Sequence, residues 1–144
     1  MRVYIPARPD QIPTITSGMW EPPLGFAVTG PLLDLVDSDD DDELAEVVLD
    51  VAAWASLEDL GAPLRLVVVA EVSRSESEAA PDVSPAAVRL TGRIPTSAIA
   101  CAFMDESEAG DDAAGAAAGD EEAADRLAER DLLWYDASEI AHLG

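Results

Sequence analysis

Residues 40–72 have the sequence DDDELAEVVLDVAAWASLEDLGAPLRLVVVAEV, in which a helical pattern is followed directly by a strand pattern. Apolar residues beginning with Leu44 recur at the three- and four-residue spacing of an amphipathic helix, which predicts a helix over residues 40–60. Its first residues are acidic, as the free amide groups and dipole of a helix start favour, and Gly61 ends it. The stretch therefore predicts one long helix that turns an apolar face toward a core.

The strand pattern is the uninterrupted apolar run LVVVA at residues 66–70. Such a run is typical of a central strand that is covered on both faces of a sheet. Weaker patterns predict further strands and a second helix over residues 120–130. The sequence as a whole predicts one α+β domain over residues 1–144, with a mixed sheet of about five or six short strands packed by two main helices.

Two polar segments interrupt these elements. Residues 73–86 are rich in Ser and Glu and are expected to form a polar loop. Residues 105–119 are acidic and rich in Ala and Gly, and their glycines favour a flexible linker within the domain over an ordered helix.

The charge of the chain is strongly negative, because 30 acidic residues stand against 8 basic ones and give a formal net charge of −22. Phosphate backbones and anionic membranes are bound through clustered Arg and Lys, whereas here the arginines are scattered and there is no lysine. We therefore expect neither nucleic acid nor a membrane as partner. The leading hypothesis is a non-enzymatic interaction or regulatory module that binds a basic protein partner, with its oligomeric state left open.

One acidic run could hold a divalent cation, through Asp37, Asp39 and Asp41. The spacing of a calcium loop is not met, because Asp42 stands where glycine is needed and Val48 stands where the bidentate glutamate is needed. A solvated run of acids at a helix start explains the same residues. Both readings stay open at this point.

No catalytic residue and no cofactor are predicted. The chain has one histidine, His142, and one cysteine, Cys101, so it lacks the ligand sets of zinc sites and the pairs of thiol enzymes. Two alternatives to the interaction module remain. A carboxylate-based or metal-dependent hydrolase would need a pocket of converging acids, and a DNA-mimic protein would need acids spaced along one elongated face.

Aromatic residues supply the candidate partner contacts. Trp134 and Tyr135 are adjacent at the end of the last predicted strand, where alternation sends them to opposite faces, one to the core and one toward solvent. Tyr and Trp are enriched at protein interfaces, so the exposed member is a candidate for partner contact. Trp20, in a turn beside two prolines, is a second candidate.

The sequence also predicts a cytoplasmic location. A single cysteine cannot form an internal disulfide, and its apolar neighbours favour a buried, inert thiol. The amino terminus lacks the apolar core of a signal peptide, and no segment approaches the roughly 20 apolar residues of a membrane span.

Four stretches of this sequence resemble a family of short, uncharacterised proteins of high-GC Gram-positive bacteria, in which a domain of unknown function spans nearly the whole chain. The resemblance implies a location and no activity, since it carries no catalytic residue that could be transferred. The segment 105–119 and the proline-broken first helix are departures from it. The four stretches are Arg2-Val3-Tyr4-Ile5-Pro6-Ala7, Gly25-Phe26-Ala27-Val28-Thr29, Leu66-Val67-Val68-Val69-Ala70 and Leu132-Leu133-Trp134-Tyr135.

Overall fold

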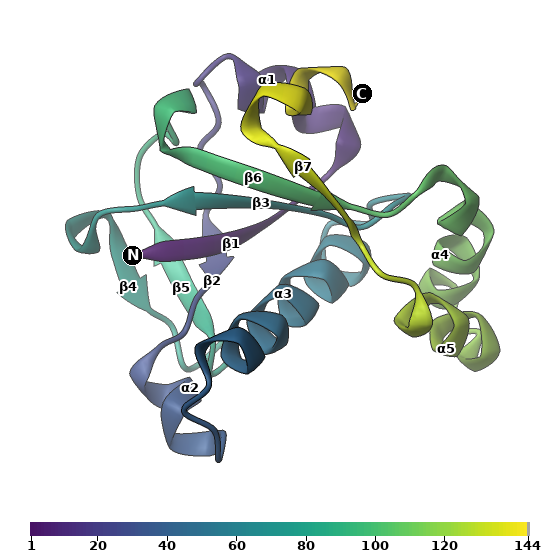
Figure 1. The fold of residues 1–144 in the computed structure, drawn as a ribbon, viewed down its shortest axis with the longest axis horizontal. Helices are drawn as coiled ribbons and strands as arrows, with labels where there is room; N and C mark the ends of the chain where they lie inside the picture. Colours follow the sequence, from purple (N-terminus) through teal and green to yellow (C-terminus); the bar gives the residue numbers. More distant parts are fainter. Residues whose placement is uncertain (144) are drawn as a thin grey trace.

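A computed structural model describes residues 1–143, which form one seven-stranded sheet with helices on both faces (Figure 1). The strands are β1 (Arg2–Ala7), β2 (Leu24–Phe26), β3 (Leu66–Glu71), β4 (Ser77–Ala79), β5 (Ala87–Leu90), β6 (Ile99–Met104) and β7 (Leu133–Asp136). The α-helices are α1 (Ile12–Thr16), α2 (Gly30–Leu35), α3 (Asp41–Glu58), α4 (Gly110–Ala117) and α5 (Glu121–Glu129). Short 3-10 helices are η1 (Pro9–Gln11), η2 (Arg74–Glu76), η3 (Thr96–Ala98), η4 (Ser107–Ala109) and η5 (Ala137–His142).

The strands lie in the order β4-β5-β2-β1-β3-β6-β7, and every neighbouring pair is antiparallel. The α+β class is confirmed, but the predicted mixed sheet is wrong in strand direction and in strand number. An apolar run reports burial on both faces, which helices can provide for an antiparallel strand as well as for a parallel one. The extra strand β4 lies within the predicted polar loop 73–86, where pairing with β5 compensates for a sequence without apolar alternation.

Two hydrophobic cores occupy the two faces of the sheet. On one face, Ile5 of β1 and Val68 of β3 pack with residues of α1 and η5. On the other face, Val67 of β3 packs with Val48 and Ala52 of α3. The first five residues of β3 are buried, so the prediction of a strand covered on both faces is confirmed.

Helix α3 follows its prediction closely and crosses one face of the sheet (Figure 1). Asp40 is its N-cap, and its Oδ1 accepts a hydrogen bond from the Asp42 N–H at 2.9 Å. Gly61, with φ of +66°, stands in the left-handed region just beyond the helix end. Leu57, near that end, contributes to a third, smaller core under α4 and α5.

The predicted flexible linker 105–119 is wrong for its second half, which forms α4. Alanine is the best helix former, and a run of it stabilises a helix when a neighbouring element covers one side. That element is α5, and a Cβ placed on Gly115 would lie only 2.7 Å from Ala123 Cβ. Gly115 thus lets two helices approach closely, and Gly119, with φ of +94°, turns the chain between them.

Gly25 is a second glycine whose replacement should lower the stability of the fold. Gly25 lies in β2, and a Cβ there would fall well inside contact distance of the Cγ1 of Val3, which is fully buried. We expect Gly25→Ala to lower the free energy of unfolding by about 1–3 kcal/mol, as overpacking does. Urea denaturation measures it, with Gly110→Ala, which meets nothing within 4 Å, as the control. Equal losses in the two variants would contradict the prediction.

Candidate functional site

A groove runs between α3, β6 and the segment that joins α5 to β7, and we call it the acidic groove. It has a volume of about 360 Å³. Helix α3 supplies Glu46, Leu49 and Asp50, and β6 supplies Phe103. The other lining residues are Arg65, which precedes β3, Ala128 of α5, and Arg130, Asp131 and Leu132 of the joining segment. Acids therefore stand on two walls of the groove, with aliphatic and aromatic side chains between them.

The two arginines of the groove are already engaged. Arg65 is 2 % exposed, and its Nε and Nη2 donate to the two carboxylate oxygens of Asp105 at 2.9 and 2.8 Å. Its Nη2 also donates to the Leu127 carbonyl oxygen at 3.1 Å, which ties α5 to the sheet. The Trp54 ring lies under the guanidinium carbon at 5.5 Å from the ring centroid. Arg65 therefore holds the wall of the groove in place, and its charge is already neutralised by Asp105.

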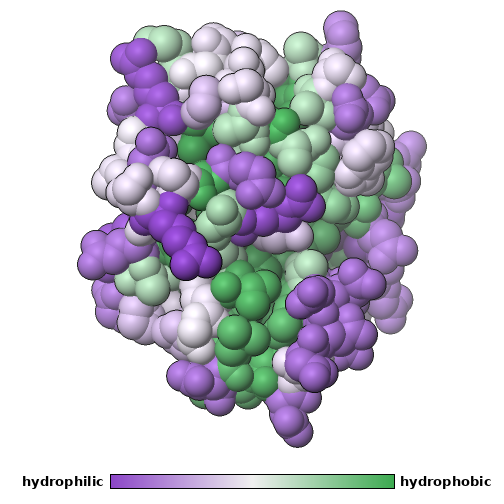
Figure 2. All heavy atoms as spheres, turned by 60° about the vertical axis from the view of Figure 1, so that its left-hand side comes forward, coloured by the Kyte–Doolittle hydropathy of each residue, from purple (hydrophilic) through white to green (hydrophobic). Residues whose placement is uncertain are grey.

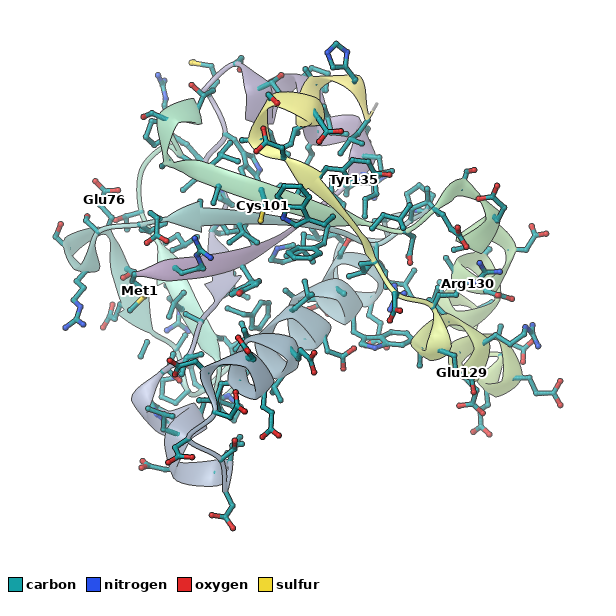
Figure 3. The ribbon with its side chains drawn as sticks, in the orientation of Figure 1. Met1, Glu76, Cys101, Glu129, Arg130 and Tyr135 are labelled. Carbon is teal, nitrogen blue, oxygen red and sulfur yellow. The ribbon has the colours of Figure 1, made fainter. Side chains whose placement is uncertain are left out.

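Arg130 is held in the same way by acids outside the groove. Its Nε donates to Asp112 Oδ2 at 3.1 Å and its Nη1 to Glu106 Oε1 at 2.7 Å, beside α4 and α5 (Figure 3). Arg126 forms a second ion pair with Asp112, from its Nε to Oδ1. The hydrogen bonds from the guanidinium groups of Arg126 and Arg130 hold the pKa of the Asp112 carboxyl below its usual range.

The three acids of the groove, by contrast, are not paired with either of these arginines. Glu46, Asp50 and Asp131 are exposed, and none forms an ion pair within residues 1–143. They do not converge, since the described residues contain no group of three His, Cys, Asp or Glu side chains that could hold a metal ion. Their negative charge is distributed along the groove, which suits a ligand with several cationic groups more than a single ion.

Trp134 adjoins this groove from the edge strand β7. It lies directly opposite Phe103, so both side chains are on the same face of the sheet. Trp134 is 58 % exposed, whereas Tyr135 lies opposite Ala102 and packs against the first core. The predicted alternation of these two aromatics is confirmed, and the exposed member is the one beside the acids.

The acids proposed as metal ligands lie elsewhere. Asp37 and Asp39 are exposed in the turn before α3, and Asp41 is the first residue of that helix. The adjacent Asp40 is the N-cap, so the run serves as a helix start. No candidate set of metal ligands is present here or elsewhere in residues 1–143.

Of the other residues considered in the sequence, Trp20 and Cys101 are buried and His142 is exposed. Trp20 is only 4 % exposed and packs in the first core, and its carbonyl oxygen accepts a hydrogen bond from the Ile94 N–H at 2.9 Å. Cys101 is buried as predicted, in β6 beside the edge strand β7 (Figure 3). Burial raises the pKa of its thiol, against the effect of a hydrogen bond with Trp134, so the thiol form is favoured. His142 is exposed in η5.

A separate apolar area lies over α2 at the lower end of the molecule, between hydrophilic flanks (Figure 2). Leu33 and Leu35 of α2 are both exposed, as is Val28 just before the helix. Figure 2 thus shows a surface on which hydrophobic side chains gather.

The acidic groove could be predicted only in part. Glu46 and Asp50 are four residues apart on the polar side of the predicted helix, so their common face follows from helical spacing. Phe103 and Asp131 join them only through the pairing of β6 with β7, for which the sequence holds no local signal.

Comparison with known protein families gives a match that covers all the residues that the structure describes. The family described as a family of unknown function (DUF6912) matches residues 1–143. The chain belongs to this family. No curated protein and no solved structure matches this DUF6912 chain. Within the described residues, no helix combines the length and the hydrophobicity that crossing a membrane requires.

Proposed function

We propose that this DUF6912 protein is a non-enzymatic interaction module that binds a basic segment of a protein partner in the acidic groove. The observation that supports this most strongly is the set of uncompensated acids, Glu46, Asp50 and Asp131, around an apolar floor and beside the exposed Trp134. Cationic side chains of a partner would pair with these acids, and its apolar side chains would pack on Phe103 and Trp134.

The chemistry of the groove favours a polypeptide over other ligands. Negative charge that is spread along a channel repels nucleic acid and anionic lipid, and it attracts a chain with several Arg or Lys. An exposed Trp at the edge of such a channel is the residue type that most often anchors a partner. The cytoplasmic location, the high-GC Gram-positive source, the hydrolase and the DNA mimic remain predictions.

Binding of a defined basic peptide tests the proposal. A fluorescently labelled peptide of alternating arginine and leucine should bind, and binding should weaken as salt is added. The variant Glu46→Gln/Asp50→Asn/Asp131→Asn should bind about tenfold more weakly, because three exposed ion pairs of about 0.5 kcal/mol each sum to about 1.5 kcal/mol.

The matched control is Glu76→Gln/Glu78→Gln/Glu121→Gln, which removes the same charge from exposed positions outside the groove. Equal weakening in the two variants would mean that only the net charge attracts the peptide, and it would refute the groove as the site. A Trp134→Ala variant should weaken binding at high salt as well, since its contribution is apolar.

A further inference from the structure

A second, smaller cavity lies on the side of α3 that faces β1 and β2, and we call it the Trp20 pocket. Its volume is about 250 Å³, a little below the roughly 300–1,000 Å³ of sites for drug-sized ligands. Its walls are mainly apolar and stiff, because Trp20, Leu24 and three prolines contribute to them. The lining residues are Pro6, Gln11, Trp20, Glu21, Pro22, Pro23, Leu24, Ala55, Asp59 and Leu60.

One side chain of this lining, Trp20, has a polar group that no protein atom within residues 1–143 engages. The Trp20 side chain is in the core, yet its indole N–H forms no hydrogen bond within residues 1–143. It is not sealed from solvent either, since the described residues contain no buried polar side-chain atom without a partner. The opening that Trp20 lines is this pocket. A ligand there can therefore offer a hydrogen-bond acceptor to the indole N–H.

The mouth of the pocket is negative. Asp59 follows the last residue of α3, where the carbonyl end of the helix dipole is itself negative, and it lines the pocket. The carboxylate and the helix dipole therefore both contribute negative charge at the pocket.

The nearby cations leave Asp59 uncompensated. Arg8 donates to the Leu60 and Gly61 carbonyl oxygens at 2.5 and 3.2 Å and to Asp10, and Arg93 pairs with Glu21 at 3.4 Å. Asp59 forms no ion pair within residues 1–143. A cation that enters the pocket would meet this carboxylate.

We propose that the Trp20 pocket accepts one arginine or lysine side chain of the basic partner, and this inference rests on the proposed function. The apolar walls fit the aliphatic stem of such a side chain, and Asp59 fits its cationic head. A peptide carbonyl of the same residue would accept from the Trp20 indole N–H. A residue within a polypeptide supplies all three groups together, whereas a free alkyl amine lacks the carbonyl.

Capped amino acids test the pocket apart from the groove. The probe is N-acetyl-arginine methylamide, and the readout is the indole N–H signal of Trp20 in ¹⁵N-resolved NMR spectra, assigned with Trp20→Phe. We expect this signal to shift on titration while those of Trp54 and Trp134 stay in place. The citrulline analogue, which has the same shape without the charge, should bind about two- to threefold more weakly, the factor of one exposed ion pair.

Two variants of the protein test whether the guanidinium group of the arginine probe lies at Asp59. Asp59→Asn should weaken binding of the arginine probe to the same degree as the loss of the probe's charge, and the neighbouring exposed Glu58→Gln is the matched control. Equal binding of arginine and citrulline probes, or equal effects of the two variants, would overturn the proposal. Binding of butylguanidinium as tight as that of the arginine probe would also overturn it, because the peptide carbonyl would then contribute nothing.

The two proposals fail separately. The variant Glu46→Gln/Asp50→Asn/Asp131→Asn leaves the Trp20 pocket intact, so it should bind the arginine probe as the parent does. If the basic peptide binds in the groove and the arginine probe does not reach Trp20, the pocket proposal alone is wrong. If the probe shifts the Trp20 signal and the groove variant binds the peptide normally, the groove proposal alone is wrong.

Discussion

Replacing Asp105 with alanine is expected to lower the free energy of unfolding by about 3–5 kcal/mol, the cost of leaving one charge of a buried ion pair without its partner. Arg65 and Asp105 are 2 and 3 % exposed, and the carboxylate accepts both guanidinium bonds and the Arg65 main-chain N–H at 3.0 Å. Without it, the guanidinium would remain in a site that excludes water. Urea denaturation followed by circular dichroism measures the loss.

Two further variants make this prediction specific. Asp125→Ala removes an exposed acid of α5 and should change the stability by no more than about 0.5 kcal/mol. Arg65→Met/Asp105→Leu removes both charges and should recover part of the loss, because apolar side chains of similar size often replace a buried ion pair at little cost. A single Asp105→Ala variant as stable as Asp125→Ala would show that the pair contributes nothing.

The second large effect is expected at Ser56, a fully buried serine within α3. Its hydroxyl donates to the Ala7 carbonyl oxygen at 2.7 Å and accepts from the Leu66 N–H at 3.1 Å, so it joins the end of β1 and the start of β3. Ser56→Ala would remove two buried hydrogen bonds, each worth about 0.5–1.5 kcal/mol. We expect a total loss of about 1–3 kcal/mol in the free energy of unfolding.

The control for this prediction is Ser75→Ala, which removes an exposed hydroxyl bonded to another exposed serine. Hydrogen exchange adds a local readout. The amide proton of Leu66 should lose protection in Ser56→Ala beyond what the global loss of stability explains. Unchanged protection at Leu66 would show that another acceptor replaces the hydroxyl.

The candidate site shows which features of a surface can be predicted from neighbouring residues in the chain. Strand alternation predicts that one of the adjacent residues Trp134 and Tyr135 is exposed, and that rule needs only the neighbours in the chain. Only the structure shows that the exposed one is Trp134, and that Trp20 is buried in the first core although it lies among turn residues. For residues 105–119, composition predicts a flexible linker because Gly115 weakens an isolated helix, whereas in the structure Gly115 allows the close contact between α4 and α5.

The sequence by itself determined the long acid-capped helix, the strand that is buried on both faces, the exposure of one aromatic in β7 and the negative charge of the chain. These follow from periodicity, propensity and charge, which act between neighbours along the chain. Only the tertiary structure decided that all strands run antiparallel, that Arg65 meets Asp105, and that Phe103 and Asp131 face Glu46 and Asp50 across a groove. Such pairings join residues that are distant in sequence, and their free energy depends on packing that no local pattern records.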